Sequence, residues 1–309
     1  MSRQITNHIM MIRPVSFRMN EQTRANNFYQ KEGATSDAQE AALKQFDTFV
    51  HKLRKEGVVV TVFEDTLQPS TPDSIFPNNW ISFHADGKVR LYPMYAENRR
   101  LERRQDIVDY FQKEYKVQEV VSFTDWEMQG AYLEGTGSLI LDRPNKIAYA
   151  AISERTNPEV LDDFSRESGF KVVSFHAFHA VKGKRLPIYH TNVMMCLGEQ
   201  FAVVCLHSID GHDDRIKLVH SLQINDKEII EITETQKEQF AGNMLQVLGA
   251  EGETLVVMST QAYNCLNEDQ IQCLERHGRI VHSDIHTIET LGGGSARCMM
   301  AEIFNPKLN

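Results

Sequence analysis

Features that divide a chain into separate domains are missing from this sequence. Its 309 residues contain no linker rich in proline, glycine or serine, no low-complexity tract and no long block of like charge. A prior of about 100–200 residues per domain would allow two domains. Because no change of composition marks a boundary, we expect a single catalytic domain over residues 1–309.

Cysteines and long apolar runs are also scarce. The five cysteines are an odd number without a CxxC pair, which argues against a disulfide scaffold and a zinc ribbon. The apolar run Ile9–Ile12 is too short for the core of a signal peptide. No stretch approaches the roughly 20 apolar residues that span a bilayer. We therefore expect a cytoplasmic protein without a membrane partner.

Excess positive charge is absent as well. The net charge is −9, and a nucleic-acid partner would require a basic face that displaces counterions from phosphate. The one basic cluster, Arg99, Arg100, Arg103 and Arg104, is interleaved with Glu102, a pattern typical of an exposed helix face. We expect no nucleic-acid partner and place this cluster on the surface.

What the chain does contain is one pattern repeated five times. A small or amide residue leads into an apolar strand, a polar turn and, in most cases, a second apolar strand. The segments begin at Asn79, Ser138, Asn192, Asn243 and Ala296, roughly 51–59 residues apart. The fifth segment lacks its second strand, which the run Ile9–Ile12 could supply by closing a ring.

Helical spacing separates these hairpins, and a short apolar strand follows most of the helices. The expected helices are Asp37–Gly57, Leu101–Tyr115, Asn157–Gly169, Thr235–Gly242 and Asn267–Gly278, and the expected following strands are Val58–Phe63, Lys116–Phe123, Lys171–Phe175 and Arg279–His282. The unit of hairpin, helix and strand predicts an α/β fold of five pseudo-repeats around a central axis.

Conspicuous polar residues stand where the first strand of a unit begins. They are Asn79, Glu134, His190 with Asn192, and Cys298. In a ring these starts converge on the axis, so we expect the functional site there.

Cys298 has the surroundings of a nucleophile. It follows three glycines in LGGGSARC, and consecutive glycines let a backbone approach a ligand and present N–H groups. Arg297 beside it could favour the attacking thiolate. The alternative is a buried structural thiol, the commonest fate of a free cysteine.

His190 and Glu134 could complete a catalytic set. A histidine can protonate a leaving amine near neutral pH, and a carboxylate can orient that histidine. Each residue alone could instead be structural. His190 could be a histidine whose hydrogen bonds are made within the fold, and Glu134 could be an exposed acid in a turn. His176 and His179 form a rival cluster, but no third ligand is evident, so we expect no metal. Whether Asp73 or Arg13 enters the pocket stays open.

Together these residues resemble the guanidino-group-modifying enzymes of the pentein fold, and among them the citrulline-utilisation hydrolases. The resemblance covers nearly the whole chain. Its motifs are FPNNW (76–80), EGTGS (134–138), SERTN (153–157), HTN (190–192) and GGGSARC (292–298). It implies a five-bladed α/β propeller with Cys298 as nucleophile, His190 as general acid and base, Glu134 as its partner, and Arg155 on the substrate carboxylate. Arg155 could alternatively be a helix-start residue with a surface partner.

Two departures from the family pattern bear on the substrate. Arginine deiminases carry aspartates where this chain has Asn79 and Asn192, and those carboxylates hold a cationic guanidinium. An amide offers both a donor and an acceptor, which suits a neutral ureido group. We therefore expect citrulline to be hydrolysed to ornithine, carbon dioxide and ammonia through an S-carbamoyl enzyme, without a cofactor. Backbone N–H groups of Gly293 and Gly294 are expected to bind the developing oxyanion.

Other functions remain open at this stage. The same nucleophile would serve an amidinotransferase, an arginine deiminase or a dihydrolase, which differ in their products. A pentein that only binds another macromolecule would not need Cys298, His190 and Glu134 together. The expected partner is a small amino-acid substrate, and self-association into a homo-oligomer is left undecided.

Overall fold

The computed structural model describes residues 3–31 and 37–308, which form a mixed α/β structure. It contains five three-stranded sheets and one hairpin, and within the described residues no sheet closes on itself. In sheet order the strands are β17 (Ala301–Glu302), β1 (His8–Arg13) and β2 (Val59–Glu64); β3 (Ile81–Phe83), β4 (Lys88–Leu91) and β5 (Glu119–Ser122); β6 (Ile140–Asp142), β7 (Ile147–Ala151) and β8 (Lys171–Phe175); β11 (Met195–Leu197), β12 (Phe201–Val204) and β13 (Glu228–Glu231); β14 (Leu245–Leu248), β15 (Thr254–Ser259) and β16 (Arg279–Ser283). The hairpin is β9 (Phe178–Val181) with β10 (Lys184–Pro187).

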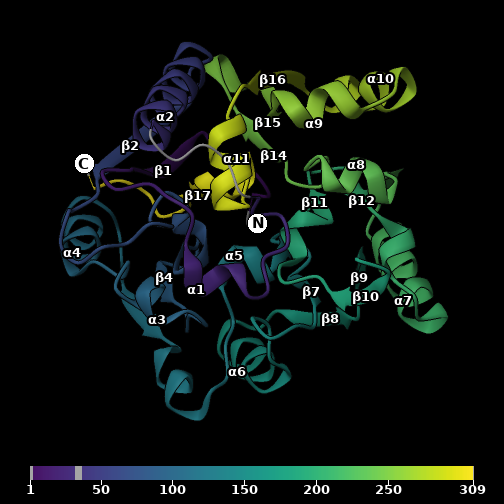
Figure 1. Ribbon diagram of the computed structural model, residues 1–309, viewed down its shortest axis with the longest axis horizontal. Helices are drawn as coiled ribbons and strands as arrows, with labels where there is room; N and C mark the ends of the chain where they lie inside the picture. Colours follow the sequence, from purple (N-terminus) through teal and green to yellow (C-terminus); the bar gives the residue numbers. More distant parts are fainter. Residues whose placement is uncertain (1–2, 32–36, 309) are drawn as a thin grey trace.

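Every three-stranded sheet combines one antiparallel and one parallel pair. In the third sheet, for example, β6 runs antiparallel to β7, and β8 runs parallel to β7. Parallel neighbours require a long crossover, which a helix usually provides. The crossover helices are α2 (Ala38–Lys55), α4 (Gln105–Glu114), α6 (Pro158–Ser168), α7 (His212–Ile224) and α10 (Glu268–His277). Figure 1 shows the sheets around a common centre with these helices on the outside.

Helix α2 illustrates why the sequence forms these crossovers. Its buried residues Ala42, Phe46, Phe49, Val50 and Leu53 recur at helical spacing and pack into one apolar cluster with residues of β1 and β15. The opposite face is polar and exposed. Burial of this single stripe holds the helix against the sheets and leaves the inner strand ends free to form a site.

The first and last strands of the chain lie in one sheet. Ile9 of β1 pairs with Glu302 of β17 in antiparallel register, and His8 pairs with Val59 of β2 in parallel register. The expectation that the N-terminal run supplies the missing strand of the fifth segment is therefore confirmed.

One crossover was misplaced by the sequence pattern. The helix expected at Thr235–Gly242 is only the short α8 (Glu234–Glu238), and the crossover of that unit is α7. The apolar residues of α7 do not form one stripe, because Leu218 is buried while Ile216 and Ile224 are exposed. Amphipathic spacing, the main signal for a helix, is absent from this segment.

Short helical turns precede four of the inner strands and meet at the centre. They are η1 (Pro77–Asn79), α5 (Gly135–Ser138), η3 (Thr191–Val193) and η6 (Ala296–Met299). Turn α5 packs against η1 and η3, and η1 packs against η6. The remaining short helices are α1 (Glu21–Arg24), α3 (Glu97–Arg100), α9 (Thr260–Cys265) and α11 (His286–Gly292), with turns η2 (Thr124–Gln129), η4 (Leu206–Ser208) and η5 (Ala250–Gly252).

We expect Gly135→Ala to destabilise this centre. Gly135 has φ +45°, and an added Cβ would lie 2.3 Å from the carbonyl oxygen of Asn78. The strained backbone of an alanine at this φ and the displacement of the Asn78 carbonyl should together lower the free energy of unfolding by about 3 kcal/mol or more, measured by urea denaturation. The control is Gly130→Ala, which has φ +68° but no neighbour within 4 Å. Equal losses in both variants would show that the packing at α5 is not tight.

Candidate active site

The inner turns surround a very small cavity, of about 10 Å³, at the centre of the molecule. It is lined by Asn27, Asp73, Phe76, Asn79, Arg99, Arg155, Tyr189, His190, Gly292, Gly293, Gly294 and Cys298. Six of the eight site residues expected from sequence are in this lining, and the other two, Glu134 and Asn192, lie directly behind it. Arg13 is not part of it, because its guanidinium pairs with Asp47 and Glu64 at the surface.

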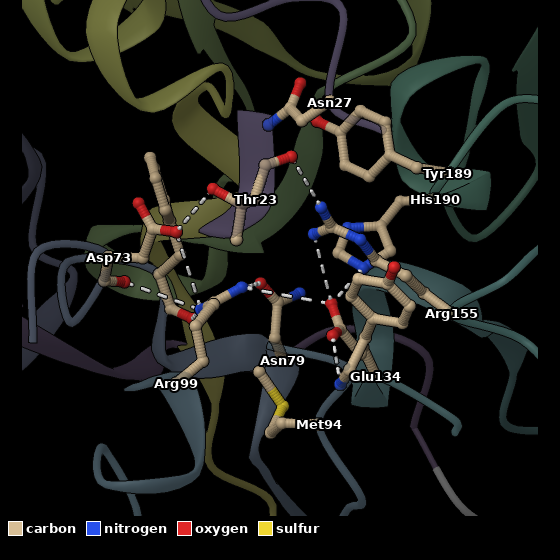
Figure 2. Close-up of polar contacts among 12 residues, drawn as sticks. Thr23, Asn27, Asp73, Asn79, Met94, Arg99, Glu134, Arg155, Tyr189 and His190 are labelled. Atoms are coloured by element: carbon tan, nitrogen blue, oxygen red, sulfur yellow. Dashed lines mark hydrogen bonds and ion pairs between the residues drawn. The ribbon is translucent and has the colours of Figure 1, made fainter. Parts of the chain in front are cut away.

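Glu134 and His190 form a buried pair. The Oε2 atom of Glu134 lies 2.7 Å from Nε2 of His190, and the Glu134 side chain is 0% exposed (Figure 2). Burial acts to raise the pKa of Glu134, but Arg155, His190 and Arg99 outweigh it and hold that pKa well below its usual range. An ionised carboxylate only accepts hydrogen bonds, so Nε2 of His190 carries the proton.

His190 is therefore placed as a neutral base. Burial lowers the pKa of His190 to about 4, although the hydrogen bond and charge of Glu134 act to raise it. With the proton on Nε2, the Nδ1 atom is left as the acceptor. A Cβ added to Gly137 would lie 2.9 Å from this Nδ1 and 2.3 Å from Nδ2 of Asn79, so both atoms flank the same point above Gly137.

Cys298 lies between two side-chain amides. Its Sγ is 3.4 Å from Nδ2 of Asn192 and 3.3 Å from Nδ2 of Asn243, and the residue is 3% exposed. The expectation that Arg297 favours the thiolate of Cys298 is not met. Its guanidinium instead donates to Glu302 and to the carbonyl of Met300, each at 2.8 Å. From the sequence, Asn243 was identified only as the start of the fourth repeated segment and not as a site residue. Its place at a repeat start, like that of Asn79 and Asn192, was the signal that could have identified it.

Arg99 corrects a second expectation. It was placed on an exposed helix face, but its side chain is 2% exposed and bonds to Glu102 at 2.9 Å and to Oδ1 of Asn79 at 2.8 Å. Burial raises the pKa of Glu102 to about 7 and also raises the pKa of Asp73, against the opposing charge of Arg99. The side chain of Arg99 thus points inward, because it pairs there with Glu102 of the same segment and with Asp73.

The contact with Arg99 decides how the amide of Asn79 is oriented. A guanidinium only donates, so the atom it contacts must be Oδ1. The Nδ2 atom of Asn79 is buried and has no hydrogen-bond partner among the described residues. In Asn192 the Nδ2 atom faces the sulfur of Cys298 at 3.4 Å, and its buried Oδ1 has no hydrogen-bond partner in the described part of the chain. These two amides therefore leave one free donor, on Asn79, and one free acceptor, on Asn192.

The N-terminal segment covers the cavity, which sequence analysis did not anticipate. Arg155 donates to Oδ1 of Asn26 and to the carbonyl of Thr23 at 3.2 Å, and it lies 3.5 Å from Glu134. Thr23 also donates to Asp73 at 3.1 Å (Figure 2). Arg155 is thus a buried residue of the centre, and the alternative of a surface partner is wrong.

In the glycine loop, Gly292 to Gly294, one of the two N–H groups expected to bind the oxyanion is not available. The N–H of Gly293 donates to the carbonyl of Glu289 at 3.0 Å and ends α11, so it is not free to bind an oxyanion. Its carbonyl accepts from the hydroxyl of Tyr189 at 2.5 Å. Gly294 lines the cavity beside it.

The histidine pair considered for a metal does not form a ligand set. His176 is exposed and contacts Asp214, whereas buried His179 stacks on Tyr29. Among the described residues, Glu228, Cys273 and His277 do gather closely enough to hold an ion. They lie at the surface, away from the cavity. In residues 3–31 and 37–308, no helix has the length and apolar character needed to cross a membrane.

Comparisons with known proteins agree with this architecture. The sequence profile of the family described as N,N dimethylarginine dimethylhydrolase, eukaryotic, matches residues 13–305. A comparison with curated proteins yields no match.

Three solved structures show the same fold at low sequence identity. Apo ArgZ, an arginine dihydrolase from the ornithine-ammonia cycle in cyanobacteria, superposes with a TM-score of 0.74 at 18% identity, covering 97% of this chain and 41% of ArgZ. Unliganded AgrE gives 0.71 at 18% identity, covering 98% of this chain and 40% of AgrE. This chain therefore spans less than half the length of either protein.

The third structure matches over its whole length. A dimethylarginine dimethylaminohydrolase, in adduct with S-methyl-L-thiocitrulline, gives a TM-score of 0.62 at 16% identity, covering 97% of this chain and 100% of that one. The fold is mixed α/β and is similar to that of pentein-fold proteins. With the profile matching residues 13–305, the chain belongs to the N,N dimethylarginine dimethylhydrolase family.

Proposed function

We propose that this protein hydrolyses the ureido C–N bond of citrulline, with Cys298 as nucleophile. The observation that carries the proposal is the polarity of the two amides. Asn79, in the cavity lining, has a free N–H donor, and Asn192, directly behind the lining, has a free carbonyl acceptor. A ureido group offers the complementary carbonyl oxygen and NH2 group, whereas a guanidinium offers donors only.

The rest of the cavity suits an amino-acid head group. Asp73 is buried with Oδ1 free of partners among the described residues, so it can accept from an ammonium. Arg155 lines the same cavity and can pair with a carboxylate. A zwitterionic substrate would satisfy both charges and would displace the Arg155 contact to Asn26.

The proposed reaction uses the neutral state of His190. His190 takes the thiol proton of Cys298, and the sulfur attacks the ureido carbon. The C–N bond to the ornithine nitrogen then breaks, and His190 returns the proton to that leaving amine. Water, deprotonated by His190, attacks the S-carbamoyl group. Thiolate and carbamic acid are released, and the latter decomposes to carbon dioxide and ammonia.

Asn79 is also placed to stabilise the intermediate. Its free Nδ2 flanks the same point as Nδ1 of His190, so it can donate to the oxygen that gains charge during attack. The N–H of Gly294 is a second candidate donor. No metal or cofactor enters these steps.

The five sheets would correspond to the blades of a single α/β propeller domain working in the cytoplasm.

A second function is favoured by the similarity to ArgZ. An arginine dihydrolase would release ammonia from the guanidinium first and then hydrolyse the ureido group at the same thiol. An amidinotransferase would instead pass the group to an amine. The two free amide groups fit the second dihydrolase step directly, whereas neither of them supplies the negative charge that would favour the guanidinium of the first step.

Product analysis tests the proposal. Ammonia release and amino products would be measured for wild-type protein and for Cys298→Ala with citrulline, arginine, N-succinylarginine, agmatine and methylarginines. We expect citrulline to yield ornithine, with the variant inactive. Turnover of arginine far above citrulline would replace the ureidase assignment by the dihydrolase, and guanidino transfer to glycine would replace it by the transferase.

Asn79→Asp is expected to change the substrate preference. The substitution removes the free donor and adds a carboxylate acceptor, which favours a guanidinium over a ureido group. The ratio of kcat/KM for arginine to that for citrulline should rise on the order of 100-fold. Asn78→Asp is the control, because it adds the same charge one residue away from the cavity lining. A similar rise in that control would point to a long-range field rather than the Asn79 contact.

A further inference from the structure

The sulfur of Cys298 is surrounded by amide N–H groups rather than by a bonded cation. Two Nδ2 atoms, from Asn192 and Asn243, lie 3.4 and 3.3 Å from Sγ. The neighbouring guanidinium of Arg297 is bonded to Glu302 instead. Hydrogen bonds to an ionised acceptor are roughly twice as strong as neutral ones, so both contacts would strengthen when the sulfur gives up its proton during the reaction.

Asn243 is fixed more firmly than Asn192. The backbone N–H of Arg297 donates to its Oδ1 at 2.9 Å, which identifies the oxygen and leaves Nδ2 as the donor. That Nδ2 also contacts the carbonyl oxygen of Asn192 at 2.8 Å. The distance from Sγ to Oδ1 of Asn243 is longer, 3.7 Å. The side chain is 0% exposed, and each of its polar atoms bonds to one of the inner turns.

We infer that Asn243 is a positioning residue of the reaction, which stabilises the thiolate of Cys298 and fixes its sulfur against Asn192. The inference rests on the proposed function only in taking Cys298 as the nucleophile. One side chain from the fourth repeat thus connects the turn of the third repeat with that of the fifth. The contacts to the sulfur come from neutral amides and not from a positive group, which suits attack on a neutral substrate carbon.

The test compares two substitutions of the same side chain. Asn243→Asp keeps an acceptor for the N–H of Arg297 but turns a carboxylate oxygen toward the sulfur, whereas Asn243→Ala removes both contacts. If the donor to sulfur matters, Asn243→Asp is the worse variant. If Asn243 only anchors the backbone of Arg297, Asn243→Ala is the worse variant. The opposite orders separate the two roles.

The measurement is alkylation of Cys298 by iodoacetamide, followed by peptide mass spectrometry at about pH 8, where an introduced carboxyl is ionised. Cys265 and Cys273, partly exposed and outside the cavity, serve as references within each sample. We expect the Cys298 rate to fall roughly 10-fold in Asn243→Ala and 100-fold in Asn243→Asp, with the reference rates unchanged. The value of kcat should follow the same order, with little change in KM.

Two outcomes would overturn the inference. One is faster alkylation of Cys298 in Asn243→Asp than in Asn243→Ala. The other is an alkylation rate of Cys298 in wild type that is no higher than the rate in either variant. If Asn243→Asp does not fold by circular dichroism, Asn243→Ser replaces it; it keeps a hydroxyl donor and must react faster than Asn243→Ala. Alkylation does not require the substrate. The expected order without citrulline turnover would therefore refute the proposed function and leave this inference standing.

Discussion

Replacing Cys298 by serine is expected to abolish turnover, lowering kcat roughly 10⁴-fold or more. A serine hydroxyl does not ionise near neutral pH, and the two amides that face the sulfur cannot make it a comparable nucleophile. The substitution is nearly isosteric in a buried position, so binding should survive. Isothermal titration calorimetry with citrulline should then show an affinity close to the wild-type KM, while ammonia release disappears.

Cys265→Ser is the matched control for this loss. Cys265 is also a free thiol, but it donates to the carbonyl of Ala262 at 3.1 Å and lies outside the cavity. Its replacement should leave kcat within about twofold of wild type. A covalent substrate adduct recovered on Cys265 instead of Cys298 would contradict the assignment of the nucleophile.

Glu134→Gln should produce the next largest effect, a fall in kcat of roughly 10²–10⁴-fold. The carboxylate fixes the proton of His190 on Nε2 and compensates the charges of Arg99 and Arg155, which lie 3.9 and 3.5 Å away. A neutral amide can offer an N–H to Nε2 and thus stabilise the wrong tautomer. Two guanidinium groups would also lose their shared anion, so a lower free energy of unfolding should accompany the loss.

The pH profile distinguishes this role from a structural one. Burial lowers the pKa of His190 to about 4, and the reaction needs its neutral form, which prevails above that pKa. In wild type the acid limb of kcat/KM should therefore lie well below the ordinary histidine pKa of about 6.5. An acid limb near 6.5 would show that His190 is not the titrating base.

Glu127→Gln is the control for Glu134. Glu127 also accepts from a backbone N–H, that of Met94, and pairs with Arg103 at 2.6 Å, but it is not part of the cavity lining. Its replacement should cost stability without moving the acid limb. A fall in kcat equal to that of Glu134→Gln would assign both effects to folding.

The sequence was most informative where repetition and side-chain chemistry coincided. Each unit begins at an inner turn, so the starts at Asn79, His190 and Asn192 were enough to place polar side chains at one centre, with Cys298 on the last turn. The pairing of β1 with β17 followed from counting strands. These features depend on local pattern, and local pattern is what a single sequence displays.

Residues that act through tertiary contacts could not be found in this way. Arg99 stands in a segment that reads as surface charge, and only burial beside Glu102 and Asp73 makes it part of the centre. Thr23 and Asn26 lie in a segment without regular spacing, far from Arg155 in sequence. The same holds for α7, whose packing is not encoded as an apolar stripe. Such contacts arise from the folded chain as a whole.

The sheet shared by the two ends of the chain bears on when the enzyme becomes competent. Cys298 is followed directly by β17, and β17 pairs with β1, a strand from the opposite end of the sequence. Contacts this distant close late, because the entropy of the intervening chain opposes them. A ribosome would have to synthesise everything from β1 to β17 before this sheet could form next to Cys298. Recovered activity would therefore report that β1 and β17 have paired.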